Sequence, residues 1–124
     1  MTPLKKEHLE FMNNLSEHFY GVAAERGFHS PEPSIGDFIS NLHSEVSELW
    51  EAYRKNALYT ESDKSHKLEA MGYEKLNNVE EELADIIIRA LDTAKTLKVD
   101  IAKAIALKDA YNQTREYRHG NKLA

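Results

Sequence analysis

The sequence has no cysteine and, among 124 residues, only five glycines and three prolines. Without cysteine the chain has neither a disulfide framework nor a thiolate metal site, and this fits the reducing cytoplasm, where we expect the protein to reside. Scarce glycine and proline leave few breaks in regular structure. Because no sustained alternation of valine, isoleucine or aromatic residues occurs either, the sequence predicts helices throughout.

Long apolar runs and a positive net charge are absent as well. No apolar run approaches the roughly 18 residues of a membrane span, and the N-terminus has no signal-peptide stretch, so we expect no membrane association. The formal net charge of -5 argues against nucleic acid as a partner. Apolar residues make up 41% and charged residues 30%, which is typical of one globular domain, here spanning 1–124.

Apolar periodicity and capping residues predict an all-α bundle of four to five helices. The predicted helices cover about 3–26, 35–55, 61–71, 79–97 and 101–117. Each one follows a residue suited to capping, namely Thr2, Ser34, Thr60, Asn78 and Asp100. The second helix has a predicted core stripe of Ile35, Phe38, Ile39, Leu42, Val46, Leu49 and Tyr53, and the helix after 78 has one of Val79, Leu83, Ile86, Ile87, Ala90, Ala94 and Leu97.

Two acid-x-x-acid pairs stand out on these helices. Glu45 and Glu48 lie on the second helix, and Glu82 and Asp85 lie on the helix after 78. A spacing of three leaves two side chains about 60° apart on one face, and both pairs flank the core stripes in the same rotational sense. If the two helices pack side by side, the pairs meet at one edge of the seam. Glu51 continues the series but falls on the solvent side, so we exclude it as a ligand.

Four gathered carboxylates need a counter-charge, because two like charges 4 Å apart repel by about 4 kcal/mol at an effective dielectric of 20. A site of carboxylate oxygens without histidine or cysteine suits Mg²⁺ or Mn²⁺, which also bind substrate phosphates. The chemistry expected of such a site is metal-assisted attack of water on phosphorus. The alternative is that both pairs are ordinary charges on solvated helix faces.

Basic and amide side chains gather at the C-terminal end of the chain. Lys108, Asn112 and Arg115 share one helix face, while Arg118 and Lys122 follow in a basic tail that covers about 115–124. Arginines grip phosphate oxygens with two hydrogen bonds, and lysine acts as a point charge. These residues therefore suit the binding of a phosphate chain. The alternative is a favourable helix C-terminus followed by a polar tail.

Together these residues resemble the MazG-like nucleoside triphosphate pyrophosphohydrolases, an all-α family that includes the dCTP pyrophosphatases and phosphoribosyl-ATP pyrophosphatase. The family pattern is Glu-x-x-Glu on one helix and Glu-x-x-Asp on the next, which the two acid pairs match. The C-terminal segment Asn112-x-x-Arg115-x-Tyr117-Arg118-His119-Gly120-x-Lys122 is similar to that of small members. There are two departures. Ser44 replaces an acid found in many members, and 33 residues separate the pairs, more than in compact members.

The resemblance implies cleavage of a (d)NTP between its α and β phosphates, giving a nucleoside monophosphate and pyrophosphate, with nucleotide-pool housecleaning as a role. Glu45, Glu48, Glu82 and Asp85 are then the catalytic residues and the Mg²⁺ ligands, and Glu48 orients or deprotonates the water. The phosphate chain is expected to contact Lys108, Asn112, Arg115, Arg118, His119 and Lys122. Homodimers or homotetramers are expected, and the irregular stretch 56–77 is either a substrate lid or an oligomer contact.

Several interpretations stay open at this point. Trp50 is a candidate to touch the base, or else an aromatic residue of the core or of an interface. Histidines other than His119 are expected on the surface. The alternative functions are phosphoribosyl-ATP pyrophosphatase and a non-catalytic helical dimerisation module that binds a nucleotide.

Overall fold

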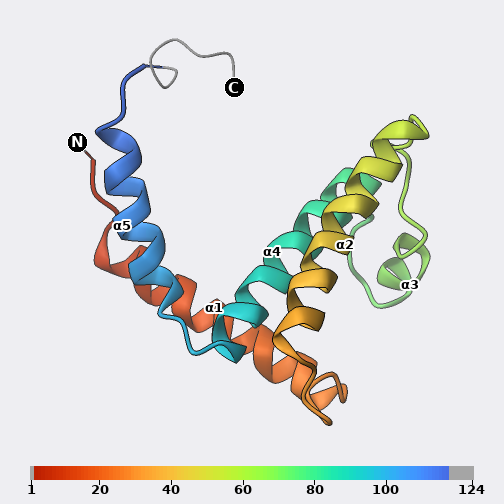
Figure 1. Cartoon of the computed structure of the whole chain (residues 1–124). Helices are drawn as coiled ribbons and strands as arrows, with labels where there is room; N and C mark the ends of the chain where they lie inside the picture. The colour runs from red at the N-terminus through yellow and green to blue at the C-terminus, as the bar shows by residue number, and fades with distance from the viewer. Residues whose placement is uncertain (1, 118–124) are drawn as a thin grey trace.

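The computed structural model describes residues 2–117, and these residues form five helices (Figure 1). They contain no β-strand, only an isolated bridge between Glu61 and Asn77, so the predicted all-α class is confirmed. No helix in this part of the chain is long and apolar enough to cross a membrane. The helices are α1 (Lys6–Glu25), α2 (Ile35–Arg54), α3 (Ser65–Ala70), α4 (Asn78–Thr96) and α5 (Ile101–Gln113).

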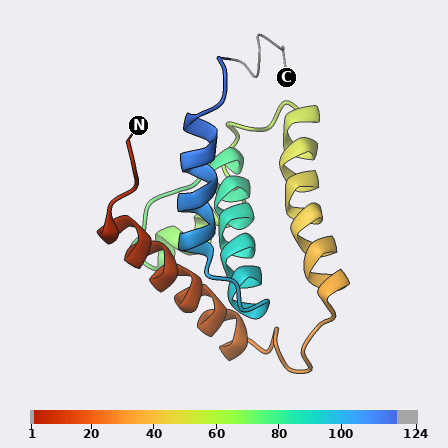
Figure 2. The same ribbon diagram turned by 60° about the vertical axis from the view of Figure 1, so that its left-hand side comes forward.

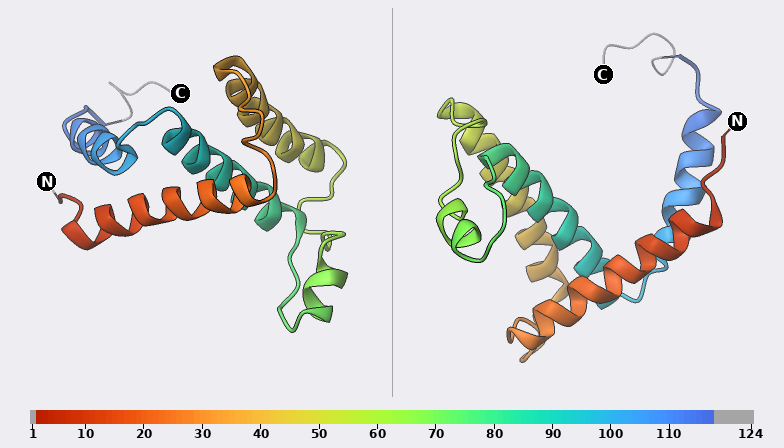
Figure 3. Two further views of the ribbon diagram at one scale, coloured as in Figure 1. Left: turned by 90° about the horizontal axis from the view of Figure 1, so that it is seen from below. Right: turned by 180° about the vertical axis from the view of Figure 1, so that it is seen from behind.

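Helix α4 is the centre of the arrangement. It runs antiparallel beside α2, and this pair forms one arm of the molecule (Figures 1 and 2). Helix α1 packs across α4 and continues to α5, which forms the other arm (Figure 3). Within the described residues α5 has no contact with α2. Neither α1 nor α5 therefore covers the whole length of the face that α2 and α4 share.

Side-chain caps fix where α2 and α5 begin. The Asp37 N–H donates to the Ser34 hydroxyl, and the Ser34 N–H donates to the Asp37 carboxylate, which is the predicted capping box. The Lys103 N–H donates to the Asp100 carboxylate at the start of α5. Both predicted starts are confirmed, and each cap stabilises its helix by about 1 kcal/mol.

The predicted start of α1 and the predicted end of α5 are wrong. Helix α1 begins at Lys6 instead of residue 3, because the Lys5 N–H donates to the His8 ring and closes the first turn there. The Thr2 N–H donates instead to the side chain of Gln113, at 2.7 Å, and so joins the N-terminus to the last residue of α5. Helix α5 ends at this residue instead of continuing to 117.

The cap of α4 is one residue earlier than predicted. The Asn77 side chain accepts from the Glu80 N–H, and the Glu80 carboxylate accepts from the Asn77 N–H. Asn78, the predicted cap, is the first helical residue, and its side-chain amide donates to the Ala57 carbonyl at 2.9 Å. The two adjacent asparagines therefore have different functions: one caps the helix and the other holds the preceding loop.

The segment 56–77, predicted to be irregular, is fastened to the start of α4 by backbone hydrogen bonds. The N–H groups of Asn78 and Val79 donate to the carbonyls of Thr60 and Leu58, at 2.9 and 2.8 Å. This segment lies beside the end of the α2–α4 arm where α2 ends and α4 begins (Figures 1 and 3).

Two buried serines join the first part of this segment to its last part. Ser62 is 3% exposed, and its N–H donates to the Leu76 carbonyl at 2.8 Å. Ser65 is 1% exposed, and its hydroxyl donates to the same carbonyl while accepting from the Leu76 N–H. Helix α3 accordingly begins at Ser65 instead of 61, and no side chain caps it, because the residues before it take part in this closure.

The core of the single chain is small. Among the described residues the buried apolar side chains are Phe38, Leu91, Ala94 and Ala102. Seven residues of the predicted core stripes are exposed, so their prediction as core positions is wrong. They are Ile35, Ile39, Val46, Tyr53, Leu83, Ile87 and Leu97. The apolar faces of α2 and α4 are wider than the surface that these two helices bury against one another. Periodicity identified an apolar face but not what covers it.

A buried histidine joins the loop between α1 and α2 to α4, although this residue was expected on the surface. The His29 side chain is 5% exposed, and its ring lies between Tyr20 and Phe38, with centroids 4.4 and 5.6 Å away. Nε2 is 2.9 Å from a carboxylate oxygen of Asp92, and Nδ1 is 3.1 Å from one of Glu32. Both ring nitrogens of His29 are thus within hydrogen-bond distance of a carboxylate. The contact with Asp92 links the loop between α1 and α2 to α4 inside the protein.

Removing this histidine should destabilise the fold. In His29→Ala the buried Asp92 carboxyl, 4% exposed, loses its hydrogen-bond partner, and the missing ring leaves a gap between Tyr20 and Phe38, which together cost about 3 kcal/mol of unfolding free energy. The control is His43→Ala, an exposed position on α2, for which we expect a change below about 0.5 kcal/mol. Urea unfolding followed by circular dichroism measures both. Equal stability of the two variants would contradict the importance of the buried contact.

Candidate metal centre

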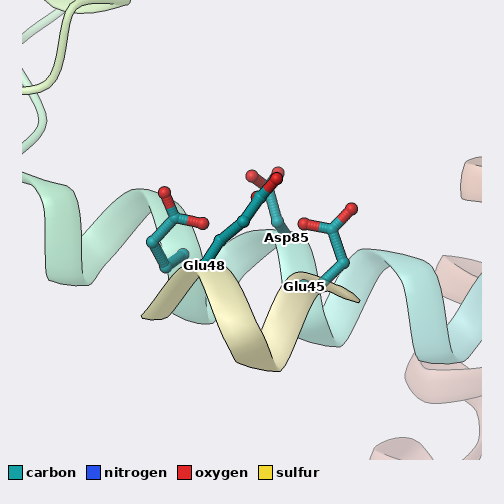
Figure 4. Close-up of side chains that lie close together, drawn as sticks. Glu45, Glu48 and Asp85 are labelled. Carbon is teal, nitrogen blue, oxygen red and sulfur yellow. The ribbon is translucent and has the colours of Figure 1, made fainter. Parts of the chain in front are cut away.

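The structure brings the four carboxylates of the two acid pairs together. Glu45 and Glu48 come from α2, and Glu82 and Asp85 come from α4. One oxygen from each residue lies within 4.8 Å of the corresponding oxygen of every other. The carboxylates labelled in Figure 4 converge on one side of the two helices. The meeting of the pairs at one edge of the seam, which the spacing predicted, is therefore present within a single chain.

Antiparallel packing explains the register of this cluster. The i, i+3 spacing places two acids on one face of each helix, one turn apart. Because α2 and α4 run in opposite directions, the residue earlier on one helix faces the residue later on the other. The pKa shifts agree with this pairing. Among the neighbouring acids, Glu48 contributes most to the raised pKa of Glu82, and Glu45 contributes most to the raised pKa of Asp85.

The cluster is unfavourable in the absence of a cation. Burial raises the pKa of Glu82 to about 7, with further contributions from the charges of Glu48, Glu81 and Asp85. Burial also raises the pKa of Asp85, and the charge of Glu45 is the next cause. Oxygen Oε2 of Glu82 is buried and has no hydrogen-bond partner among residues 2–117. A buried acceptor without a donor is costly, and a bound cation removes that cost.

One residue that the sequence interpretation missed touches the cluster. The Arg89 guanidinium donates to a carboxylate oxygen of Glu45 at 3.2 Å, and both side chains are largely covered. Arg89 follows Asp85 by four residues, so the two share one face of α4. This spacing was a signal in the sequence, but a lone arginine on a helix face is common. Arg89 offsets only one of the four charges.

The residues present fit a hard divalent cation. All four candidate ligands are carboxylates, which Mg²⁺ and Mn²⁺ prefer, and the unpartnered Glu82 oxygen lies among them. Glu51, excluded from the sequence, is not part of the cluster and pairs instead with Arg54 and Lys55. Glu80 and Glu81 lie in the first turn of α4.

Two cavities lie on opposite sides of the cluster. A cavity of about 340 Å³ borders Glu45 and Asp85, and most of its other lining is apolar, with Phe19 and Val22 from α1, Phe28 from the following loop and Ile88 from α4. A cavity of about 420 Å³ borders Glu48 and Glu82, and its other charged lining residues are two lysines and four acids, namely Lys55, Lys64, Glu51, Glu61, Asp63 and Glu81. The cluster therefore separates an apolar space from a charged one.

The predicted phosphate-binding residues that the structure describes are not at these cavities. Lys108, Asn112 and Arg115 lie on or just after α5, on the other arm, and line neither cavity. Lys108 and Arg115 lie over the Tyr111 ring instead, at 4.7 and 5.9 Å from its centroid. The other predicted phosphate contacts lie outside the described residues, namely Arg118, His119 and Lys122.

Trp50, the candidate for contact with the base, also lines neither cavity. It is 60% exposed on α2 and stacks on Tyr53, with ring centroids 5.4 Å apart. The structure therefore places it on the exposed apolar face of α2, away from the carboxylates. Its contact with a base stays a prediction.

Comparison of this chain with family models, with curated proteins and with solved structures found no match.

The raised pKa of Glu82 predicts how the stability of the metal-free protein depends on pH. The folded state binds the Glu82 proton more tightly than the unfolded chain, so this group stabilises the fold below about pH 4.5, and that contribution is lost as the pH rises to about 7. Relative to Glu82→Gln, wild type should lose about 2 kcal/mol across this range. Urea unfolding in the presence of a chelator measures this difference in unfolding free energy. If wild type and Glu82→Gln gave parallel pH profiles, the Glu82 carboxyl would not be the buried, crowded group described here.

Divalent cations should stabilise the wild-type protein. A bound cation relieves the carboxylate repulsion only in the folded state, so millimolar Mg²⁺ should raise the melting temperature by about 2 to 5 °C. Asp85→Asn should lose most of this increase, whereas Glu17→Gln, an exposed position on α1, should keep it. Differential scanning calorimetry with Mg²⁺ and with Na⁺ at equal ionic strength provides the test. A flat response of wild type would refute the metal site.

Proposed function

We propose that this protein is a Mg²⁺-dependent nucleoside triphosphate pyrophosphohydrolase, with Mn²⁺ as an alternative cation. One observation carries the proposal: four carboxylates from two antiparallel helices converge within 4.8 Å, and one of their oxygens is buried without a partner in the part of the chain that the structure describes. The match of both acid pairs to the pattern of the MazG-like family supports the same activity. The reaction breaks the bond between the α and β phosphates and gives a nucleoside monophosphate and pyrophosphate.

The four carboxylates have distinct roles in this proposal. Glu45, Glu82 and Asp85 are half-buried and hold the cation, which supplies charge neutralisation and a more acidic bound water when present. Glu48 is the exposed member of the cluster, so it reaches solvent most easily. Its carboxylate accepts a hydrogen bond from the attacking water and takes its proton as the water oxygen bonds to phosphorus. The pyrophosphate leaves with the electron pair of the broken bond.

The apolar cavity beside Glu45 and Asp85 suits the nucleoside. Its volume of about 340 Å³ and its aromatic lining from Phe19 and Phe28 are typical of sites that hold a flat ring. Arg26 at the same cavity offers hydrogen-bond donors to a base or a sugar. This placement differs from contact of the base with Trp50.

Assembly into a homodimer or homotetramer is part of the proposal. The seven exposed residues of the predicted core stripes give one chain a broad apolar surface, which soluble proteins usually cover. The same surface favours the second candidate function, a non-catalytic dimerisation module that binds a nucleotide. Release of pyrophosphate distinguishes the two, and a preference for phosphoribosyl-ATP over NTPs and dNTPs identifies the other alternative. A cytoplasmic location stays a prediction.

Turnover should depend on the cluster while the fold does not. Glu48→Gln keeps the size of an exposed side chain but removes its basic oxygen, so kcat should fall at least about 100-fold. Glu17→Gln, on the exposed face of α1, should retain activity within about twofold. A screen of NTPs and dNTPs for pyrophosphate release, with Mg²⁺ and with chelator, measures both. No release by wild type from any nucleotide, or near-normal activity of Glu48→Gln, would reject the proposal.

A further inference from the structure

The polar cavity on the Glu48 and Glu82 side of the cluster contains two lysines that nothing in the sequence interpretation assigned. Lys55 follows the last residue of α2, and Lys64 immediately precedes α3. Both ammonium groups are accessible, with side chains 69% and 62% exposed. Lys55 pairs with Glu51 at 3.6 Å, as Arg89 pairs with Glu45 across the cluster, and the cavity on the Arg89 side is mostly apolar.

Lys64 is held at this cavity by charge. Its Nζ lies 3.3 Å from Oε2 of Glu81 and 2.9 Å from Oδ1 of Asp63. Glu81 is itself fixed, because its other oxygen accepts a hydrogen bond from the buried Ser62 hydroxyl. Hydrogen bonds to Asp63 and Glu81 raise the pKa of Lys64 above its ordinary value, so the side chain stays a cation.

Lys64 shares a cavity with two of the candidate metal ligands. It lines the same cavity as Glu48 and Glu82, yet it forms its ion pairs with Asp63 and Glu81, outside the cluster. Such a group exchanges its carboxylate partners for phosphate oxygens without a large change in the fold.

We propose that Lys64, assisted by Lys55, binds the two terminal phosphates that leave as pyrophosphate, so that the substrate lies across the four carboxylates with its nucleoside in the apolar cavity. The proposal rests on the proposed function. It assigns the cavity that contains the two ammonium groups to the leaving phosphates and the mostly apolar cavity to the base and sugar. The segment 56–77 also gains a function, because its fastening to α4 positions Lys64 beside the site.

Product binding tests this orientation independently of turnover. Isothermal titration calorimetry measures the binding of inorganic pyrophosphate and, separately, of nucleoside monophosphates to the full chain in Mg²⁺. Lys64→Gln should weaken pyrophosphate binding at least about 10-fold and change monophosphate binding less than about twofold. Lys64→Arg should stay within about threefold of wild type, because it keeps the charge. Lys67→Gln, a lysine of α3 that does not line the cavity, is the matched control.

Three results overturn the subsite: wild type binds no pyrophosphate in Mg²⁺, Lys64→Gln and Lys67→Gln bind it equally well, or Lys64→Gln weakens both products to the same extent. The last result is expected if Lys64 only supports the structure, and circular dichroism of each variant checks for this. Failure of the proposed function is a separate result. Wild type then releases no pyrophosphate from any nucleotide, while the Lys64-dependent binding of pyrophosphate persists.

Discussion

Repulsion among four carboxylates at the α2–α4 seam is the constraint on which the rest of the structure depends. Each pair of like charges 4 Å apart costs about 4 kcal/mol at an effective dielectric of 20. The chain offsets part of this with Arg89 on Glu45, and it leaves an oxygen of Glu82 buried without a partner. A fold keeps such a seam only if the helices are held together by other contacts and if a ligand relieves the repulsion.

Those other contacts lie at the two ends of α4. At its N-terminal end the segment 56–77 is fastened by backbone hydrogen bonds and by the buried serines Ser62 and Ser65. Near its C-terminal end Asp92 is paired with His29, and the Ser16 hydroxyl of α1 donates to the Leu91 carbonyl at 2.6 Å. Helix α4 is thus held in place at both ends, and its two acids lie between these ends. The apolar core alone is too small to do this.

Features encoded locally were predicted from the sequence, and features created by packing were not. The caps Ser34 and Asp100 and the i, i+3 acid pairs depend on neighbours in the chain, so their spacing revealed them. The contact of His29 with Asp92 joins residues 63 positions apart, and no local pattern marks it. Lys64 reaches the acids only because 56–77 folds back onto α4. The apolar stripes were identified correctly as apolar, but their exposure depends on which surfaces a single chain covers.

The predicted and the observed positions of the basic side chains near the carboxylates differ more than any other feature. The sequence pattern assigned phosphate binding to Lys108, Asn112 and Arg115, but α5 lies against α1 on the other arm. In the proposed homo-oligomer, a second copy of the chain would bring these residues to the cluster. Lys64, in contrast, stands beside the carboxylates of its own chain. The two sources of charge are compatible, because a triphosphate bound to one divalent cation still carries negative charge on oxygens that face away from the metal.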